Sequence, residues 1–288
     1  MTDARTRGRT DTQLVAASAT LLCAAAAAVV WPLLHGPLSA ELSDIALRRF
    51  TPPLGRTPDG ALHLLGTDRF GRDLLVRLMF GARVSLAVGL LAATVGAALG
   101  VLLGAVAGYA GGWTDRVISA LTDAALAIPR VPFLLLLVAL LQPGILVTVL
   151  AIGLTGWMSI ARLVRGEVRA LRERLFVEAA RALGQAPARL VWRHLVPHAM
   201  APALVAAALG VGNAIMLEAG LSFLGLGVQP PVPSWGNMIA AGRDALVIAP
   251  WVALAPAAAV TLVVIACSLL ADGLESHLAG EPISAAGS

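Results

Sequence analysis

Long apolar stretches without a charged residue alternate along this chain with short basic segments. A helix needs about 20 apolar residues to cross the hydrocarbon layer of a membrane. The pattern therefore predicts an all-α, polytopic membrane protein with six transmembrane helices. These helices are expected within Leu14 to Leu34, Val84 to Thr114, Val117 to Leu141, Ile145 to Ala161, Ala199 to Leu221 and Ala245 to Ala271.

The third run is the least regular, because Asp123, Pro129, Arg130 and Pro132 interrupt it. Gln142-Pro143-Gly144 then forms a turn signal, so we expect a very tight connection between the third and fourth helices. Asp123 and Arg130 are seven positions apart, which predicts that they project from one helix face two turns apart.

Composition excludes the soluble classes. The chain is 58% hydrophobic and 13% charged, whereas soluble domains average roughly 45–50% apolar and about 25% charged residues. Disorder is excluded by the same excess of apolar residues. Cys23 and Cys267 both lie in apolar runs, so we expect two small buried hydrophobic side chains with neither a disulfide framework nor a metal site.

All 21 basic residues are arginine, and their distribution predicts orientation. Eight fall in residues 162–198, and positive residues stay on the cytoplasmic side. With six spans, both termini then lie in the cytoplasm. Seven arginines between residues 35 and 83 argue for the opposite orientation, because this orientation places them outside. The first apolar run exceeds the usual signal-peptide core of about 7–15 residues. It therefore favours an uncleaved anchor over a cleaved signal peptide.

The basic loop contains LFVEAARALGQAPARLVWRHLVPH at residues 175–198, which predicts two short helices. The first spans about Leu171 to Leu183, and Gly184 suits a left-handed C-terminal cap. Pro187 suits the first turn of the second helix, and Pro197 can open the fifth run in the same way. The alternative is a basic amphipathic segment that rests on anionic lipid.

Glu178-Ala179-Ala180, followed by Gly184 and Pro197, resembles the EAA loop of ABC importer permeases. Further segments extend the resemblance over nearly the whole chain, and together they are similar to the dipeptide/oligopeptide/nickel permeases. Within these permeases, the chain resembles the C-type inner-membrane subunit, in which one extra helix precedes a five-helix core. The segments are LGTDRFGRDLLVRLMFGARVSL (65–86), GYAGGWTDRVIS (108–119), ARLVRGEV (161–168), EAGLSFLGLGVQPPVPSWGNMI (218–239) and APW (249–251).

The resemblance implies a type I ABC importer permease fold. Residues 1–82 would hold the cytoplasmic N-terminus, the first helix and a loop on the outer surface. Residues 83–272 would form the five-helix core, with the cytoplasmic coupling loop at 162–198, and residues 273–288 would form a cytoplasmic tail. Two departures stand out: Val196-Pro197-His198 replaces the family's usual Leu-Pro-Asn, and Arg130 stands where a small polar residue is common.

The resemblance also implies which residues do the work. The coupling loop would dock into a cytoplasmic ATPase through Glu178, Ala179, Ala180, Gly184, Pro187, Arg189 and Pro197. Ionisable residues in membrane spans are costly and usually face protein or water, so Asp123, Arg130 and Glu218 are candidates for the translocation path. Structural ion pairing or snorkelling to lipid headgroups is the alternative for these three residues.

The connection 222–244 would lie outside the membrane, where its glycines and prolines make regular helix unfavourable and Trp235 suits the membrane interface. Near residue 67, Thr67 or Asp68 is expected to cap an amphipathic helix at the outer surface. We expect the outer mouth or a binding-protein contact to involve Asp68, Gln229, Trp235 and Asn237.

The function implied is a permease subunit of an ATP-driven importer of di- or oligopeptides in the bacterial inner membrane. The alternatives are nickel chelates or another small solute, or an ATP-independent secondary transporter. The chain has no P-loop motif, so ATP and Mg would bind partner subunits, with no cofactor on this chain. An intramembrane enzyme is disfavoured because no H-E-x-x-H or G-x-S-x-G occurs. Expected partners are a second homologous permease forming a heterodimer, two ABC ATPases, an extracytoplasmic solute-binding protein and lipid, without nucleic acid.

Overall fold

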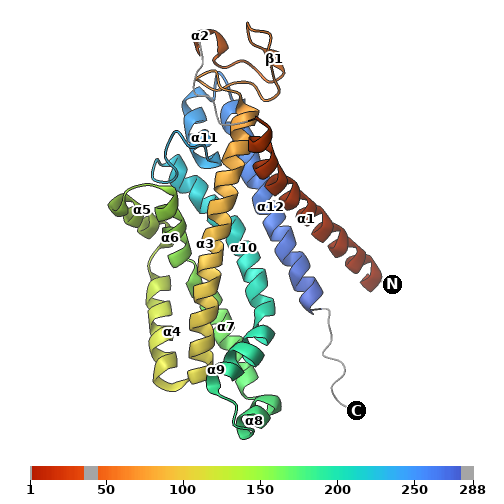
Figure 1. The fold of residues 1–288 in the computed structure, drawn as a ribbon, viewed down its shortest axis with the longest axis vertical. Helices are drawn as coiled ribbons and strands as arrows, with labels where there is room; N and C mark the ends of the chain where they lie inside the picture. The colour runs from red at the N-terminus through yellow and green to blue at the C-terminus, as the bar shows by residue number, and fades with distance from the viewer. Residues whose placement is uncertain (1, 36–44, 280–288) are drawn as a thin grey trace.

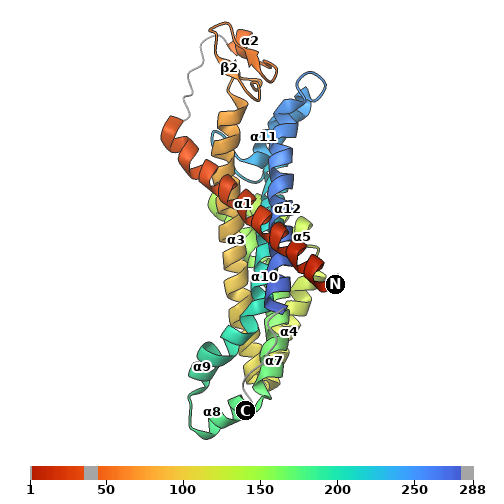
Figure 2. The ribbon, with the colours of Figure 1, turned by 90° about the vertical axis from the view of Figure 1, so that its right-hand side faces the viewer.

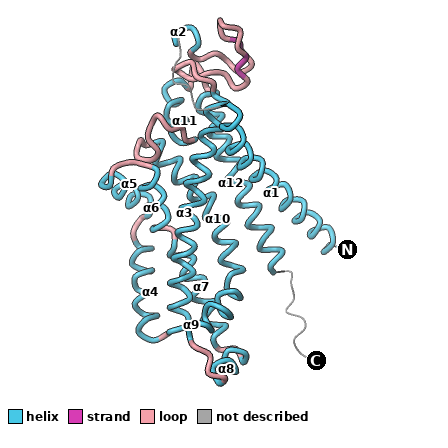
Figure 3. Tube along the Cα trace, in the orientation of Figure 1, coloured by secondary structure: helices cyan, strands magenta, loops and turns pink. Residues whose placement is uncertain are grey.

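The protein forms an elongated bundle of long helices with a small cap of loops at one end (Figure 1). The structure is a computed structural model that describes residues 2–35 and 45–279. Helix dominates, and the strands β1 (Gly55–Arg56) and β2 (Leu62–His63) form one antiparallel pair in the cap (Figure 3). The long helices are α1 (Thr2–His35), α3 (Leu74–Ala110), α7 (Trp157–Arg172), α10 (Val196–Phe223) and α12 (Trp251–Ala279). The shorter ones are α2 (Ile45–Arg48), α4 (Gly112–Ala127), α5 (Arg130–Leu141), α6 (Ile145–Leu154), α8 (Leu175–Ala182), α9 (Pro187–Leu190) and α11 (Trp235–Gly242), with a π-helical turn at Val191–Leu195 and a 3-10 turn at Arg243–Ala245.

Within the described residues, five helical segments are long and apolar enough to cross a membrane, and the bent pair α4–α5 makes a sixth if it counts as one span. This matches the six apolar runs of the sequence. The five segments lie within residues 14–31, 74–110, 145–172, 187–223 and 251–278.

The third run does not form one continuous helix. Its axis bends by 89° between α4 and α5, because Ile128 and Pro129 both adopt extended conformations. A residue before proline is driven out of the helical region by steric contact with the proline ring. The expectation that Asp123 and Arg130 share one helix face is therefore wrong: the two residues belong to different helices.

Glycines allow α3 and α7 to pack with their backbones close together. A Cβ at Gly100 would lie 2.7 Å from the Ile160 Cβ, and one at Gly104 would lie 2.5 Å from the Ala161 carbonyl oxygen. Gly108 repeats the same spacing of four residues along the helix. Small residues at this spacing are a general means of close helix approach in membranes, where packing rather than water exclusion drives association.

Helix α1 crosses the bundle diagonally and lies against α12 and α3 (Figure 2). Ala28 shares a buried cluster with Ala82 of α3 and with Val263 and Cys267 of α12. Cys267 is buried as expected, but Cys23 is exposed on the surface of α1, so that expectation is wrong for Cys23. The extra N-terminal helix is thus an integral part of the packed structure.

Candidate functional site

The segment between α7 and α10 projects at the end of the bundle opposite the loop cap (Figure 1). We call residues 173–198 the coupling segment. Helix α7 ends at Arg172, and Arg174 is extended before α8 begins. The single helix predicted from Leu171 to Leu183 is therefore two helices with a break between them.

Helix α8 ends in a Schellman motif at the glycine that the sequence singled out. Gly184 has a φ of +77°, which is the left-handed region that side chains disfavour. Its N–H donates to the Arg181 carbonyl at 2.9 Å, and the Gln185 N–H donates to the Ala180 carbonyl at 3.1 Å. These two bonds satisfy carbonyls that the end of a helix leaves free. The predicted left-handed cap is confirmed.

The chain then returns toward the membrane through two proline-initiated turns. Pro187 lies in the first turn of α9 and Pro197 in the first turn of α10, as predicted. A π-helical turn at Val191–Leu195 joins the two helices. The second helix of the coupling segment therefore continues into the membrane span.

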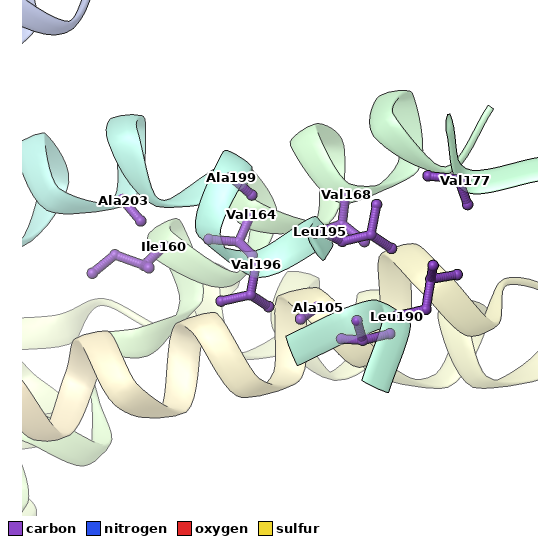
Figure 4. Close-up of a cluster of buried hydrophobic side chains, with 11 residues drawn as sticks. Ala105, Ile160, Val164, Val168, Val177, Leu190, Leu195, Val196, Ala199 and Ala203 are labelled. Carbon is purple, nitrogen blue, oxygen red and sulfur yellow. The ribbon is translucent and has the colours of Figure 1, made fainter. Parts of the chain in front are cut away.

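A cluster of buried aliphatic side chains holds the coupling segment against the bundle (Figure 4). Val177 of α8 and Leu190 of α9 are both fully buried, and they belong to the same cluster as Val164 and Val168 of α7 and Ala105 of α3. Each fully buried side chain of this kind contributes about 1.5–3 kcal/mol. The coupling segment is thus attached to α3, α7 and α10 together.

The opposite face of α8 is apolar and open. Leu175 is 82% exposed and Leu183 is 83% exposed, and Glu178 and Ala179 are exposed beside them. Ala180 is half-buried and contacts the cluster. Exposed large apolar side chains on a projecting element are typical of a protein–protein contact.

Polar and aromatic contacts tie α7 and α8 to the ends of α3 and α10. The Arg172 guanidinium donates to the Tyr109 carbonyl at 3.1 Å, and the Arg181 guanidinium lies 5.3 Å from the centre of the Tyr109 ring. The Phe176 and His198 rings are 5.8 Å apart. Pro187, Arg189 and Pro197 are exposed on the same projection.

Two ion pairs join α4 to α7, and Asp123 forms one of them. Its carboxylate lies 2.7 Å from the Arg162 guanidinium, and both side chains are more than half exposed. Asp115 forms a second, less exposed ion pair with Arg165. The two pairs lie along a cleft of about 360 Å³ between α3, α4 and α7. Sequence reasoning identified Asp123 but neither of the arginine partners.

Arg130 begins α5, and its side chain reaches the break between α6 and α7. Its guanidinium donates to the Ile152 carbonyl at 3.0 Å and to the Thr155 hydroxyl at 3.3 Å. The side chain lines a small pocket of about 130 Å³ that also involves Ser159 and Asn213. Sequence reasoning missed these last two residues, although a lone Asn in the fifth apolar run was a visible exception.

Glu218 is fully buried and its carboxylate is held by two serines. Ser85 of α3 donates to it at 2.8 Å, and Ser222 of α10 donates at 2.6 Å. The Ser85 hydroxyl in turn accepts from the backbone N–H of Trp235 at 3.1 Å, and the Ser222 hydroxyl accepts from the backbone N–H of Val228 at 3.0 Å. Glu218 therefore joins α3 and α10 to residues 224–250, which connect α10 to α12 and which we call the outer loop. Its expected path role stays a prediction.

The helix cap near residue 68 differs from the expectation. Asp73 caps α3 by accepting from the Val76 N–H at 3.0 Å, so the predicted cap at Thr67 or Asp68 is wrong. Asp68 instead shapes the preceding turn. It accepts from the Phe70 N–H at 2.8 Å and pairs with Arg72 at 2.7 Å.

The connection 222–244 folds onto itself and contains the regular helix α11, contrary to expectation. Ser234 and Asn237 form a capping box at the start of α11, and the Asn237 amide also donates to the Val232 carbonyl at 2.8 Å. The buried Trp235 indole donates to the Leu78 carbonyl at 3.1 Å, so its ring packs inside the protein, and its expected place at the membrane interface stays a prediction. Gln229 donates to the Gly225 carbonyl at 3.0 Å. The side chains of Asp68 and Trp235 are buried. The expected role of these four residues at the outer mouth or in a binding-protein contact stays a prediction.

Comparisons with known proteins agree with this architecture. Residues 100–280 match the family described as Binding-protein-dependent transport system inner membrane component. The chain is 42% identical to the dipeptide transport system permease protein of Alkalihalophilus pseudofirmus, over 76% of this chain and 72% of that protein. It is 38% identical to the oligopeptide transport system permease protein of Bacillus subtilis, over 77% and 72%.

Two further similarities cover a related permease and a solved structure. The glutathione transport system permease protein of Shigella flexneri is 42% identical over 75% of this chain and 71% of that protein. A chain of the MetNI methionine ABC transporter in an inward-facing conformation superposes with a TM-score of 0.53 at 20% identity, covering 70% of this chain and 96% of that chain. The second similarity supports the fold alone. The chain belongs to the family of binding-protein-dependent transport system inner membrane components, as a multi-pass permease subunit of an ABC importer and not an enzyme.

Proposed function

We propose that this chain is the permease subunit through which an ABC importer moves di- or oligopeptides across the bacterial inner membrane. The observation that carries the proposal is the coupling segment, which combines an anchored inner face with an exposed apolar outer face. The peptide class rests on relatives whose names specify dipeptide, oligopeptide and glutathione transport. Nickel chelates and other small solutes remain the alternatives for the test.

The proposed complex contains a second homologous permease, two ATPase subunits that bind ATP and Mg, and an extracytoplasmic solute-binding protein. Leu175, Ala179 and Leu183 offer the apolar contact to an ATPase, and Glu178 adds a negative charge among arginines. Gly184 and Pro187 fix the turn, while Arg189 and Pro197 continue the exposed surface. The apolar side chains on this surface are removed from water only when a partner protein covers them.

Movement of an ATPase would reach the membrane through the buried cluster. Val177 and Leu190 lie against the side chains of α7, and α7 lies against α3 with backbone-to-backbone contact at Gly104. Interiors packed in this way transmit displacement because they have little room to absorb it. A push on α8 would therefore tilt α3, α7 and α10 together and alternate access to the two sides. Asp123 and Arg130 are the candidates for residues beside the path.

The test uses the full complex in liposomes, with ATP hydrolysis and peptide uptake measured together. Gly184→Val forces a β-branched residue into a left-handed conformation, which costs on the order of 1–2 kcal/mol, and we expect it to reduce uptake per ATP hydrolysed at least tenfold. Glu178→Lys should weaken ATPase association. Gly225→Val is the matched control, because Gly225 has a φ of +80° at the other end of the molecule. Normal uptake in both coupling-segment variants would refute the assignment.

Orientation has its own test. With Cys23 and Cys267 replaced by serine, a cysteine at Ala188 should react only from the cytoplasm and one at Val247 only from outside. Val247 is 97% exposed in the outer loop, which makes it a suitable reporter. Reaction of both cysteines from the same side contradicts the six-span proposal, and it also contradicts the assignment of residues 1–82 and 273–288 to their expected sides.

A further inference from the structure

Arg130 carries a charge that the described residues do not neutralise. Its two hydrogen bonds go to neutral oxygens of Ile152 and Thr155, and no carboxylate within the described part of the chain lies within ion-pair distance of it. A guanidinium presents five N–H donors in a planar fork. At least part of that fork, and the whole positive charge, is left available at the pocket that Arg130 lines.

This charge lies about halfway along the length of the bundle. The pocket is also lined by Ala92 and Gly96, which lie near the midpoint of α3, and by Gly156, whose added Cβ would be 3.2 Å from an Arg130 nitrogen. An ionised arginine at such a depth is costly unless it faces protein or water. One hydrogen bond caps the Ile152 carbonyl near the end of α6 and the other goes to the Thr155 hydroxyl, and neither requires a charge to remain unpaired.

Two more polar groups meet at the same pocket from different helices. Ser159 of α7 and Asn213 of α10 are exposed and line it, and neither side chain has a hydrogen-bond partner among the residues that the structure describes. Both can donate hydrogen bonds to an anion. The rest of the lining is small or aliphatic. Three donors from three helices, one of them charged, thus surround one opening without an acidic residue among the lining residues.

We propose that Arg130, Ser159 and Asn213 form a binding site for the carboxylate of the transported solute. An Arg fork matches a carboxylate in a bidentate arrangement, and the α-carboxyl of a peptide is ionised at neutral pH. The pocket of about 130 Å³ holds an end group rather than a whole peptide. The inference rests on the proposed function only in naming a peptide as the source of the carboxylate.

The test measures the charge preference of the pocket in the purified full complex, independently of transport. A reporter cysteine replaces Leu209, which lines the pocket and is 42% exposed, in a background with Cys23 and Cys267 changed to serine. Reaction rates with a sulfonate-bearing and a trimethylammonium-bearing methanethiosulfonate are compared after correction for their rates with a free thiol. We expect the anionic reagent to be favoured about a hundredfold, because a unit positive charge roughly 12 Å away at an effective dielectric constant near 20 attracts the anion about tenfold and repels the cation about tenfold.

Arg130→Gln should abolish this preference, whereas Arg130→Lys should keep it, because the charge survives. Arg243→Gln, at an exposed arginine of the outer loop, is the control and should change nothing. Trialanine at millimolar concentration should slow the reaction of the reporter, and trialanine amide should not. An equal preference in the unsubstituted protein and in Arg130→Gln overturns the inference. A preference that depends on Arg130, in a complex that imports no peptide, would instead leave the anion site standing and reject the proposed function.

Discussion

The two ends of this molecule are built from different interactions. At the end that we propose to face the cytoplasm, the coupling segment is held by aliphatic side chains such as Val177 and Leu190, and its charged residues are exposed. At the opposite end, which we propose to face outward and call the outer end, buried polar groups centred on Glu218 and Asp68 add to an apolar cluster that includes Met238 and Val252. The charged side chains of the coupling segment are therefore open to a partner, whereas the carboxylates of Glu218 and Asp68 are already bonded inside the protein.

This difference follows from what each end must do. An aliphatic cluster is non-directional, so it can hold a segment that tilts during a transport cycle. A buried carboxylate bonded to two hydroxyls has a fixed geometry and costs free energy when it is broken. We infer that the cytoplasmic end is suited to movement and the outer end to a constant shape. Substitutions can test this contrast, beginning with α3 and α7, whose packing supports both ends.

The largest effect is expected where α3 and α7 touch. Gly104→Val places a branched side chain where even a Cβ would lie 2.5 Å from the Ala161 carbonyl oxygen. The helices must separate, which costs about 3 kcal/mol or more, so assembled complex should fall at least tenfold in the membrane. Gly166→Val on α7 is the control, because a Cβ there meets nothing within 4 Å. Equal amounts of complex in both variants would show that the close contact does not matter.

A smaller but clear effect is expected at the outer end. Glu218→Ala leaves the Ser85 and Ser222 hydroxyls without their buried acceptor, at a cost of about 2 kcal/mol. Glu218→Gln keeps one acceptor and should lose about half as much. The measurement is the thermal unfolding midpoint of the purified complex, which should fall more for alanine than for glutamine. A drop in transport without any change in the midpoint would assign Glu218 to the path instead.

The smallest effects separate the two ion pairs between α4 and α7. Arg162 and Asp123 are 58% and 67% exposed, so Arg162→Ala should change stability by less than about 1 kcal/mol. Arg165 pairs with Asp115 at 30% and 17% exposure, and Arg165→Ala should cost more. Unfolding midpoints at low and high salt provide the measurement. The opposite order, with Arg162→Ala the more damaging, would point to a transport role for Asp123 and its partner.

The membrane-spanning helices could be predicted because each one needs a run of about 20 apolar residues, and such runs are visible in the sequence. It also predicted the turn at Gly184, because a glycine after strong helix formers and before Pro187 has few other structural reasons. Both are local effects of composition and backbone geometry. The resemblance to the permease family extended these local predictions to the whole chain.

The polar network at the outer end could not be predicted in the same way. Ser85 and Glu218 are 133 positions apart, and their contact depends on how α3 and α10 pack. The loop with Trp235 contains several prolines, but Ser234 and Asn237 cap a short helix between them. The prolines on either side of Arg130 indicated an irregular helix but not the size of the bend. The 89° bend places Asp123 and Arg130 on different helices, whereas their spacing predicted one shared helix face. Tertiary contacts decided each of these cases.

The central claim is that the exposed apolar face of α8 binds an ATPase subunit, and co-purification tests it most directly. Leu183→Arg places a charge on an 83% exposed leucine of the coupling segment, and Val247→Arg makes the same kind of change at the 97% exposed valine of the outer loop. Neither position is buried, so both variants should insert and assemble with the second permease. We predict that Leu183→Arg loses at least nine-tenths of the bound ATPase while Val247→Arg keeps it, since a charge in a desolvated contact is strongly unfavourable. Full ATPase binding by Leu183→Arg would contradict the account.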